Sequence, residues 1–324
     1  MEPPLEDQAL IALLARLREQ DYQFITPTPL THSRVLANRA PRLASSLREV
    51  FGWSMPFTLR ERPAGLSDEL LALLRQAGVL ETVRPDAGGS AESCFRSAVR
   101  CSSFDDALFL HSAYPTEDQN AVFFGPDTYR FLRLIQSNLP AHDPLAPLRV
   151  LDIGCGSGAG GILAARLCAG ARLFLNDINP LALRYAAINA RALALNAELA
   201  PGDALDAVSG NFDLIVSNPP YLVDDAARAY RHGGDELGRA LSLKFAVQSL
   251  QRLAPLGRLI LYTGVAMLDG VDPFLQALRP ALAEAGCVWT YQEIDPDVFG
   301  EELERPVYRA VDRIAAVGLV AVKA

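Results

Sequence analysis

The stretch VLDIGCGSGAGG, residues 150–161, joins a short apolar run to a glycine-rich turn and leads directly into the helical pattern ILAARLCA. Glycines at 154, 156 and 158 remove side chains at positions where a ligand would contact the backbone. The helix that follows begins with unpaired N–H groups, which suit an anion or a carboxylate. The pattern predicts a nucleotide-type ligand at the carboxyl end of the first strand of an α/β sheet.

Short apolar runs alternate with helical segments from about residue 145 onward. Strands separated by helices of this length predict parallel βαβ units in an α/β sheet that is covered on both faces. The runs near residues 287–293 and 314–322 have no clear helix between them, which favours an antiparallel pair. The predicted strands are RVLDI, ARLFLN, FDLIVSN, GRLILYTG, CVWTYQEI and IAAVGLVAVK, with a weaker one around AELA.

The N-terminal part has a different pattern and predicts a smaller domain over residues 1–116, followed by a catalytic domain over residues 117–324. Leucines at 10, 13, 14 and 17 share one face of a first helix that ends near residues 19–20. A second helix begins after a serine cap at Ser67, buries Leu70, Leu71 and Leu74, and ends at Gly78.

An alternating run, CFRSAVRC at residues 94–101, follows that helix. Helix, strand and hairpin in this order predict a winged-helix-like module, with Arg96 and Arg100 on the outward face of a wing strand. Two arginines are a weak signal for DNA binding, so we favour a domain that recognises or orients the substrate.

Composition limits the classes of protein that fit. The chain has 324 residues, half of them apolar, and a net charge of −8, which disfavours a grip on long nucleic acid. No apolar stretch is long enough to span a bilayer, so we expect a cytoplasmic protein. The five cysteines and four histidines lack metal-ligand spacing, so no metal site is expected.

Two acids downstream of the glycine turn suggest which ligand binds there. Asp177 ends the second strand, where a carboxylate can accept hydrogen bonds from ribose hydroxyls or cap the next helix. Asp203 follows the weak third strand and can meet an adenine amine or simply form a Gly-Asp turn. The turn GCGSGA also fits the relaxed dinucleotide pattern, so a nicotinamide oxidoreductase stays open at this point.

The sequence VSNPPYL at residues 216–222 predicts a rigid elbow at the end of the fourth strand, because proline cannot donate to a strand ladder. The Asn218 side-chain carbonyl and the Pro219 carbonyl can both accept hydrogen bonds from one planar NH2 group. They would orient its nitrogen lone pair toward an electrophile, which is catalysis by positioning. Tyr221 is expected to stack on the flat target group.

Together, VLDIGCGSGAG, the acid in NDINP, GD at 202–203 and NPPY at 218–221 resemble class I S-adenosylmethionine-dependent methyltransferases. Within that class they resemble the amino-methyltransferase branch of small-domain and release-factor glutamine methyltransferases. The resemblance covers about residues 120–324. It implies a Rossmann-like, mostly parallel seven-stranded sheet with an antiparallel last strand, and S-adenosyl-L-methionine as cofactor, with S-adenosyl-L-homocysteine as product.

The resemblance also assigns site residues. It implies a catalytic elbow at Asn218, Pro219, Pro220 and Tyr221. It implies substrate contacts from Phe124 and Thr128, in the segment FFGPDTYRF, as well as from Tyr221; that segment can equally be a plain helix start at Pro126–Asp127. The implied cofactor-binding residues are Asp152, Gly154, Cys155, Gly156, Gly158, Asp177, Ile178, Asp203, Ala204 and Asn218.

The acceptor stays open at this stage. Similar proteins modify a glutamine amide in translation release factors, N6 of adenine in RNA or DNA, or N2 of guanine in ribosomal RNA, so the expected partner is a macromolecule, with DNA the less favoured. The polar segment 224–236, which contains His232, has the composition of a gate over the substrate. A nicotinamide oxidoreductase and a catalytically silent binding module are the alternatives, and the oligomeric state is undetermined.

Overall fold

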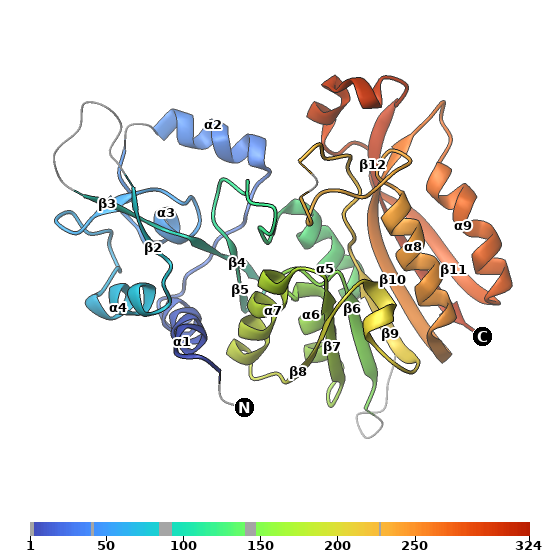
Figure 1. Cartoon of the computed structure of the whole chain (residues 1–324), viewed down its shortest axis with the longest axis horizontal. Helices are drawn as coiled ribbons and strands as arrows, with labels where there is room; N and C mark the ends of the chain where they lie inside the picture. The colour runs from blue at the N-terminus through green and yellow to red at the C-terminus, as the bar shows by residue number, and fades with distance from the viewer. Residues whose placement is uncertain (1–2, 40–41, 84–92, 140–146, 227) are drawn as a thin grey trace. The chain divides into compact units, whose positions relative to one another are not determined.

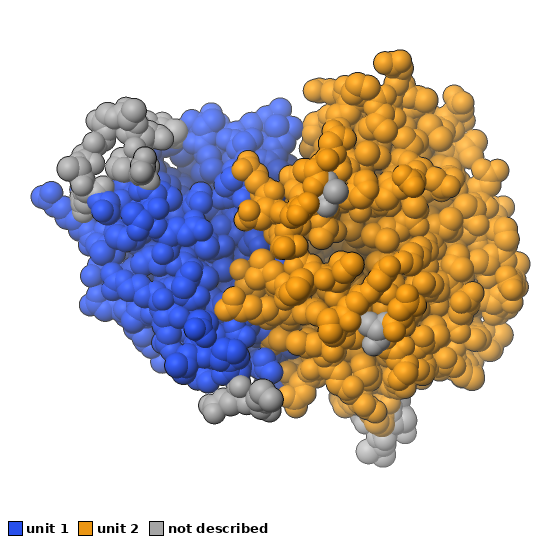
Figure 2. Space-filling model, in the orientation of Figure 1, with its two compact units in different colours: residues 1–116, 122–126, 188–194 blue, residues 117–121, 127–187, 195–324 orange. Residues whose placement is uncertain are grey.

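The computed structural model describes residues 3–39, 42–83, 93–139, 147–226 and 228–324 (Figure 1). The chain forms two compact units, which Figure 2 colours separately. Unit 1 contains residues 1–116, 122–126 and 188–194, and unit 2 contains residues 117–121, 127–187 and 195–324. Within the described ranges, none of the helices is long and apolar enough to cross a membrane.

Unit 1 is built from short helices and two small sheets. The predicted Ser67 cap is present, since its hydroxyl accepts a hydrogen bond from the Leu70 N–H, and the three predicted leucines of that helix are buried. One antiparallel sheet has the strand order β1-β3-β2, and β4 and β5 form a separate antiparallel pair. The elements are α1 (Leu5–Glu19), α2 (Pro29–Arg39), α3 (Leu47–Phe51), β1 (Phe57–Thr58), α4 (Asp68–Gln76), β2 (Leu80–Val83), β3 (Cys94–Ser97), β4 (Val99–Phe104) and β5 (Ala107–Ser112).

The prediction of a single wing strand over residues 94–101 is wrong. The Ser97 hydroxyl accepts a hydrogen bond from the Val99 N–H and donates one to the Val99 carbonyl, so the run breaks there and continues in a different sheet. Arg100 is consequently buried, and its guanidinium donates to the Gly52 carbonyl. Arg96 instead pairs with Glu81 at 2.9 Å, so the two arginines do not share an outward face.

Unit 2 contains the predicted seven-stranded sheet, in the order β11-β12-β10-β9-β6-β7-β8. The neighbours β8, β7, β6, β9 and β10 pair in parallel, and β12 runs antiparallel between β10 and β11, which confirms the predicted antiparallel last strand. The strands are β6 (Arg149–Ile153), β7 (Arg172–Asp177), β8 (Ala197–Pro201), β9 (Phe212–Ser217), β10 (Leu253–Met267), β11 (Cys287–Asp295) and β12 (Arg313–Lys323).

Helices cover both faces of this sheet. Leu151 and Ile153 of β6 belong to the core cluster that also contains Phe245 and Phe274, so α8 and α9 cover their face; Figure 1 shows these two helices side by side. Asp152 lies between those leucine and isoleucine positions and therefore points to the opposite face, where it contacts α6. The helices are α5 (Pro126–Asn138), α6 (Ala159–Leu167), α7 (Pro180–Ala192), α8 (Ala240–Gln251) and α9 (Pro273–Glu284), with short 3-10 turns η1 (Ala204–Ala207), η2 (Gly300–Glu304) and η3 (Pro306–Tyr308).

Candidate active site

Strand register aligns the four predicted motifs at one edge of the sheet in unit 2. Ile153 of β6 pairs with Ser217 of β9 on one side and with Asn176 of β7 on the other. The next residue of each strand is therefore Gly154, Asn218 or Asp177, side by side at the carboxyl ends. Since Asp177 in turn pairs with Pro201 of β8, the Gly202–Asp203 turn extends the same row. This edge is where parallel α/β sheets bind ligands.

The glycine turn adopts a conformation that favours glycine. Gly154, Gly156 and Gly158 have φ values of 64°, 54° and 78°, in the left-handed region. A Cβ at Gly158 would lie 2.9 Å from the Ala186 Cβ, whereas one at Gly156 would meet no atom within 4 Å. The backbone at Gly156 therefore faces open space, as a turn that receives a ligand against its backbone requires.

Cys155 contributes its backbone to the turn. Its N–H donates to the Asn176 carbonyl at 2.9 Å, and its carbonyl accepts from the Gly158 N–H at 2.7 Å. Burial, followed by the charges of Asp177 and Asp152, raises the pKa of the Cys155 thiol well above its ordinary value. The side chain is therefore a neutral thiol beside the two carboxyl groups, and its backbone shapes the loop.

Asp152 is the more deeply buried of these two acids, with 1 % of its surface exposed. Its Oδ2 accepts a hydrogen bond of 2.7 Å from the Gly161 N–H in the first turn of α6. Burial raises the pKa of Asp152 to about 7, the Gly161 hydrogen bond opposes that rise, and the Asp177 charge adds to it. The site thus holds a carboxyl group whose charge changes near neutral pH.

Asp177 connects the glycine turn to the end of β7. Its Oδ2 accepts from the Gly156 N–H and its Oδ1 from the Asn179 N–H, each at 2.9 Å. The Asn179 side chain, in turn, accepts from the Leu181 N–H in the first turn of α7, so Asn179 is the residue that caps that helix. Burial raises the pKa of Asp177, and hydrogen bonds from Asn179, Gly156 and Ile178 oppose that rise.

The remaining predicted cofactor positions lie further along the same edge. Ile178 is 70 % exposed. The Asp203 carboxylate forms an ion pair of 2.6 Å with Lys244 of α8, and both side chains are partly exposed. Ala204 is buried and begins η1 with a φ of 50°. Ile178 therefore presents an exposed apolar surface directly after Asp177, and the Asp203 carboxylate is held by Lys244.

The elbow itself has the polar group that the sequence predicts. Asn218 follows β9 directly, and it is half-buried. Within the described part of the chain, its side-chain amide has no hydrogen-bond partner, and neither has the Pro219 carbonyl. Ser217, one residue earlier, fixes the strand end because its hydroxyl donates to the Ile153 carbonyl at 2.9 Å. Pro220, also half-buried, completes the turn into Tyr221.

Tyr221 is held differently from the stacking platform expected from the sequence. It is only 8 % exposed, and its hydroxyl donates to the Asp127 carboxylate at 2.6 Å. The same carboxylate accepts from the Tyr262 hydroxyl at 2.7 Å and from the Arg130 guanidinium at 3.1 Å. The ring packs against Gly264, where a Cβ would lie 2.1 Å from the Tyr221 Cε2. Tyr221 therefore anchors the elbow to α5 and β10.

Local sequence does not reveal this anchor. The pattern around Asp127 indicates only a helix start, and the pattern around Tyr262 and Gly264 indicates only a strand. Nothing nearby distinguishes these residues, because their roles depend on contacts with residues 94 and 135 positions away in the sequence.

The two remaining substrate predictions fall in different units. Thr128 is half-buried in the first turn of α5 and belongs to unit 2, next to Asp127. Phe124 belongs to unit 1, where its ring stacks on Phe109 at 5.7 Å and on His111 at 5.4 Å between ring centroids. Its side chain therefore contributes to an aromatic cluster of unit 1.

Comparison with known proteins identifies the family of this chain. Residues 128–263 match the family model described as the methyltransferase small domain. A release factor glutamine methyltransferase from Deinococcus radiodurans is 32 % identical over 251 residues, which cover 73 % of this chain and 86 % of that protein.

Two further relatives match shorter regions. A release factor glutamine methyltransferase from Lactococcus lactis subsp. lactis is 30 % identical over 170 residues, 49 % of this chain and 62 % of that protein. A ribosomal RNA small subunit methyltransferase C from Shewanella denitrificans is 44 % identical over 85 residues, 26 % of this chain and 24 % of that protein. The chain thus spans less than two thirds of the length of both of these relatives.

Proposed function

Because the chain belongs to the class I S-adenosylmethionine-dependent methyltransferases that contain the methyltransferase small domain, we propose that it methylates a planar NH2 nitrogen of a macromolecule. Family membership implies S-adenosylmethionine as the methyl donor. The GCGSGA turn also fits a dinucleotide pattern, but membership of this family favours S-adenosylmethionine over a nicotinamide cofactor as its ligand.

One observation carries the proposal for the acceptor. The Asn218 amide and the Pro219 carbonyl, at the carboxyl end of β9, have no hydrogen-bond partner within the described residues, whereas the Ser217 hydroxyl before them and the Tyr221 hydroxyl after them are both bonded. Two unpaired acceptors on a rigid elbow are suited to the two hydrogens of one planar NH2 group. Holding both hydrogens localises the nitrogen lone pair and directs it out of the plane of the group.

The chain's own residues suit the donor. The left-handed glycines of the turn leave its backbone open at Gly156, Asp177 offers a carboxylate to ribose hydroxyls, and Ile178 offers an exposed apolar surface. The donor supplies a methyl group on a sulfonium: a C–N bond forms as the C–S bond breaks, and the nitrogen then loses a proton to water. Neither a metal nor a catalytic histidine is needed for this transfer.

A glutamine side-chain amide of a translation release factor is the acceptor to test first, because a relative that this chain covers to 86 % of its length is named a release factor glutamine methyltransferase. An exocyclic amine of ribosomal or other RNA is the second candidate, since shorter regions match ribosomal RNA enzymes at 44 % identity. Both acceptors present the flat NH2 group that the elbow suits.

The proposal is tested by calorimetry and by methyl transfer. We expect S-adenosylmethionine and S-adenosylhomocysteine to bind the wild type, NADH to fail, and Asp177→Ala to lose binding by about 10²-fold or more, as expected when a charged hydrogen-bond acceptor is removed. Glu198→Ala is the control, because Glu198 is an exposed acid of the same sheet that pairs only with Arg172 among the described residues.

Transfer of labelled methyl groups to release factors, ribosomes and RNA then distinguishes the acceptors. Asn218→Ala should lower kcat by about 10²-fold or more, since it removes an orienting acceptor. Binding of the donor without transfer to any of these acceptors would refute the proposed reaction and favour a silent binding module.

A further inference from the structure

The two residues that follow the elbow, Leu222 and Val223, are hydrogen-bonded through their backbone to two later parts of the chain. The Leu222 N–H donates to the Arg231 carbonyl at 3.2 Å, and the Leu222 carbonyl accepts from the Gly233 N–H at 2.8 Å. The Val223 N–H donates to the Tyr308 hydroxyl at 2.8 Å, and the Val223 carbonyl accepts from the Arg305 guanidinium. The backbone directly after the elbow is therefore fixed residue by residue.

Two segments supply these partners. One is the chain from Arg228 to Gly238, which returns to the elbow so closely that a Cβ at Gly238 would lie 2.2 Å from the Tyr221 carbonyl oxygen. The other is segment 299–308, in the connection between β11 and β12, which provides Arg305 and Tyr308. Segment 299–308 reaches Tyr221 as well, because Phe299 meets its ring edge to face with 6.0 Å between centroids.

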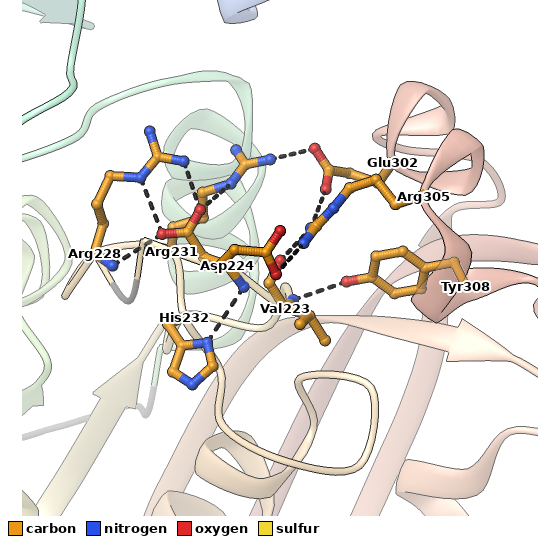
Figure 3. Close-up of polar contacts among 9 residues, drawn as sticks. Val223, Asp224, Arg228, Arg231, His232, Glu302, Arg305 and Tyr308 are labelled. Carbon is orange, nitrogen blue, oxygen red and sulfur yellow. Dashed lines mark hydrogen bonds and ion pairs between the residues drawn. The ribbon is translucent and has the colours of Figure 1, made fainter.

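An ion-pair cluster joins the two segments (Figure 3). Asp224 accepts three hydrogen bonds from the guanidinium and backbone of Arg228, which lower the pKa of Asp224 to about 2. Glu302, with 9 % of its side chain exposed, pairs with Arg231 from one segment and Arg305 from the other. Partly buried pairs of this kind are weakly screened by salt, and each charged side chain in the cluster has an oppositely charged partner.

The polar segment 224–236, whose composition predicts a gate, is held in the structure at Asp224, Arg228 and Arg231 by these ion pairs. Three arginines balance Asp224, Asp225 and Glu302 within the cluster, so its charges are internally compensated. Segment 299–308 also contains a strained residue, since Phe299 has a φ of 54° without being glycine. Such conformations persist where surrounding contacts determine them, and they concentrate at functional sites.

We propose that Tyr308 and Arg305 are positioning residues for methyl transfer: they hold Val223 and thereby fix the far side of the elbow that orients the acceptor nitrogen. This inference rests on the proposed function. Strand β9 holds the Asn218 side of the elbow and Asp127 holds the Tyr221 side chain. The contacts at Val223 hold the backbone that leaves the elbow, and so limit its movement relative to the Pro219 carbonyl. Orientation of a reacting group loses about 10²-fold in rate for a displacement of about 1 Å.

The test compares two tyrosines. Tyr308→Phe removes only the hydroxyl that accepts from the Val223 N–H, and the ring keeps its buried place. Tyr291→Phe is the matched control, because its hydroxyl also makes one hydrogen bond in unit 2, to Asp272 at 2.6 Å, away from the elbow. Arg305→Met tests the second contact, and Arg305→Lys should restore part of the effect because it keeps a charged donor.

We expect Tyr308→Phe to lower kcat about 10–100-fold while the Kd for S-adenosylmethionine stays within about threefold, a split that a global loss of stability would not produce. Hydrogen exchange at the Val223 amide should accelerate at least about tenfold in Tyr308→Phe and stay unchanged in Tyr291→Phe. Equal effects in both tyrosine variants, or no change at Val223, would overturn the positioning role.

The exchange experiment needs no methyl acceptor, so it decides whether Tyr308 holds Val223 even if the wild type methylates none of the substrates. In that event the proposed function fails on its own, because wild-type turnover is absent. If the wild type is active and Tyr308→Phe matches it in kcat and in exchange, only the positioning inference fails.

Discussion

Replacement of Asp152 by asparagine should change how the stability of unit 2 depends on pH. Asp152 is buried beside Gly161 and Asp177, and burial raises its pKa from 3.8 to about 7. Below pH 3.8 the group is protonated in both the folded and the unfolded chain. Between pH 3.8 and about 7 only the unfolded chain releases the proton, so stability falls as pH rises through this window and levels off above it.

The magnitude follows from the two pKa values. One pKa unit corresponds to about 1.4 kcal/mol, so Asp152 costs the folded state about 4 kcal/mol at about pH 8 relative to about pH 3. Between about pH 5 and about pH 8 the loss is about 3 kcal/mol. The Asp152→Asn variant would have no such loss, and the side-chain oxygen of its amide can still accept from the Gly161 N–H. Asp177 is present in both proteins, so the effect of its burial is common to both, and the substitution removes only its charge interaction with Asp152.

Urea unfolding at about pH 5 and about pH 8 measures the difference. A Trp53→Phe background leaves Trp289 of β11 as the only tryptophan, so fluorescence reports on unit 2. We expect the free energy of unfolding to fall by about 3 kcal/mol more in the parent than in Asp152→Asn between these pH values. Ser217→Ala, which removes a buried hydroxyl of the same sheet and no ionisable group, should follow the parent. Parallel pH profiles for Asp152→Asn and the parent would refute the electrostatic reasoning.

Two further predictions concern the anchor beneath the elbow. Gly264→Ala places a Cβ 2.1 Å from the Tyr221 Cε2, so the ring must move; kcat should fall about 10-fold or more, with S-adenosylmethionine binding retained by calorimetry. Unchanged kcat would mean that the position of Tyr221 does not matter. Tyr221→Phe removes one of the three donors to Asp127 and should cost about 1 kcal/mol in urea unfolding. It should also reduce kcat, whereas a tyrosine that served only as a stacking surface would tolerate phenylalanine without loss of activity.

The features that depend only on residues close together in the sequence could be predicted from the sequence alone. The glycine turn at 154–158 is recognisable because a positive φ and an open backbone select glycine locally, and all three glycines have that φ. The strands are recognisable from apolar runs of the right length, and the Ser67 cap from a serine placed before an apolar helix. The row of motifs at the sheet edge follows from the rule that parallel strands end together.

Local pattern misleads where a side chain can bind nearby backbone. Apolar and polar residues alternate over residues 94–101 as they do in a strand. The Ser97 hydroxyl nevertheless hydrogen-bonds to the Val99 backbone, and the run is divided between two sheets. The two-residue alternation is the same on either side of such a break, so the alternation does not reveal where the break lies.

Tertiary structure alone decided how the elbow is held. The Asp127 carboxylate accepts hydrogen bonds from Tyr221 and Tyr262, which are 94 and 135 residues away in the sequence. Val223 is hydrogen-bonded to Arg305 and Tyr308, which are 82 and 85 residues away. A tyrosine hydroxyl or a guanidinium has the same chemistry wherever it stands in the chain, and its partner is selected only when strands from distant segments are brought into register. The sequence therefore specified which groups can meet a ligand, and packing specified which groups hold them in place.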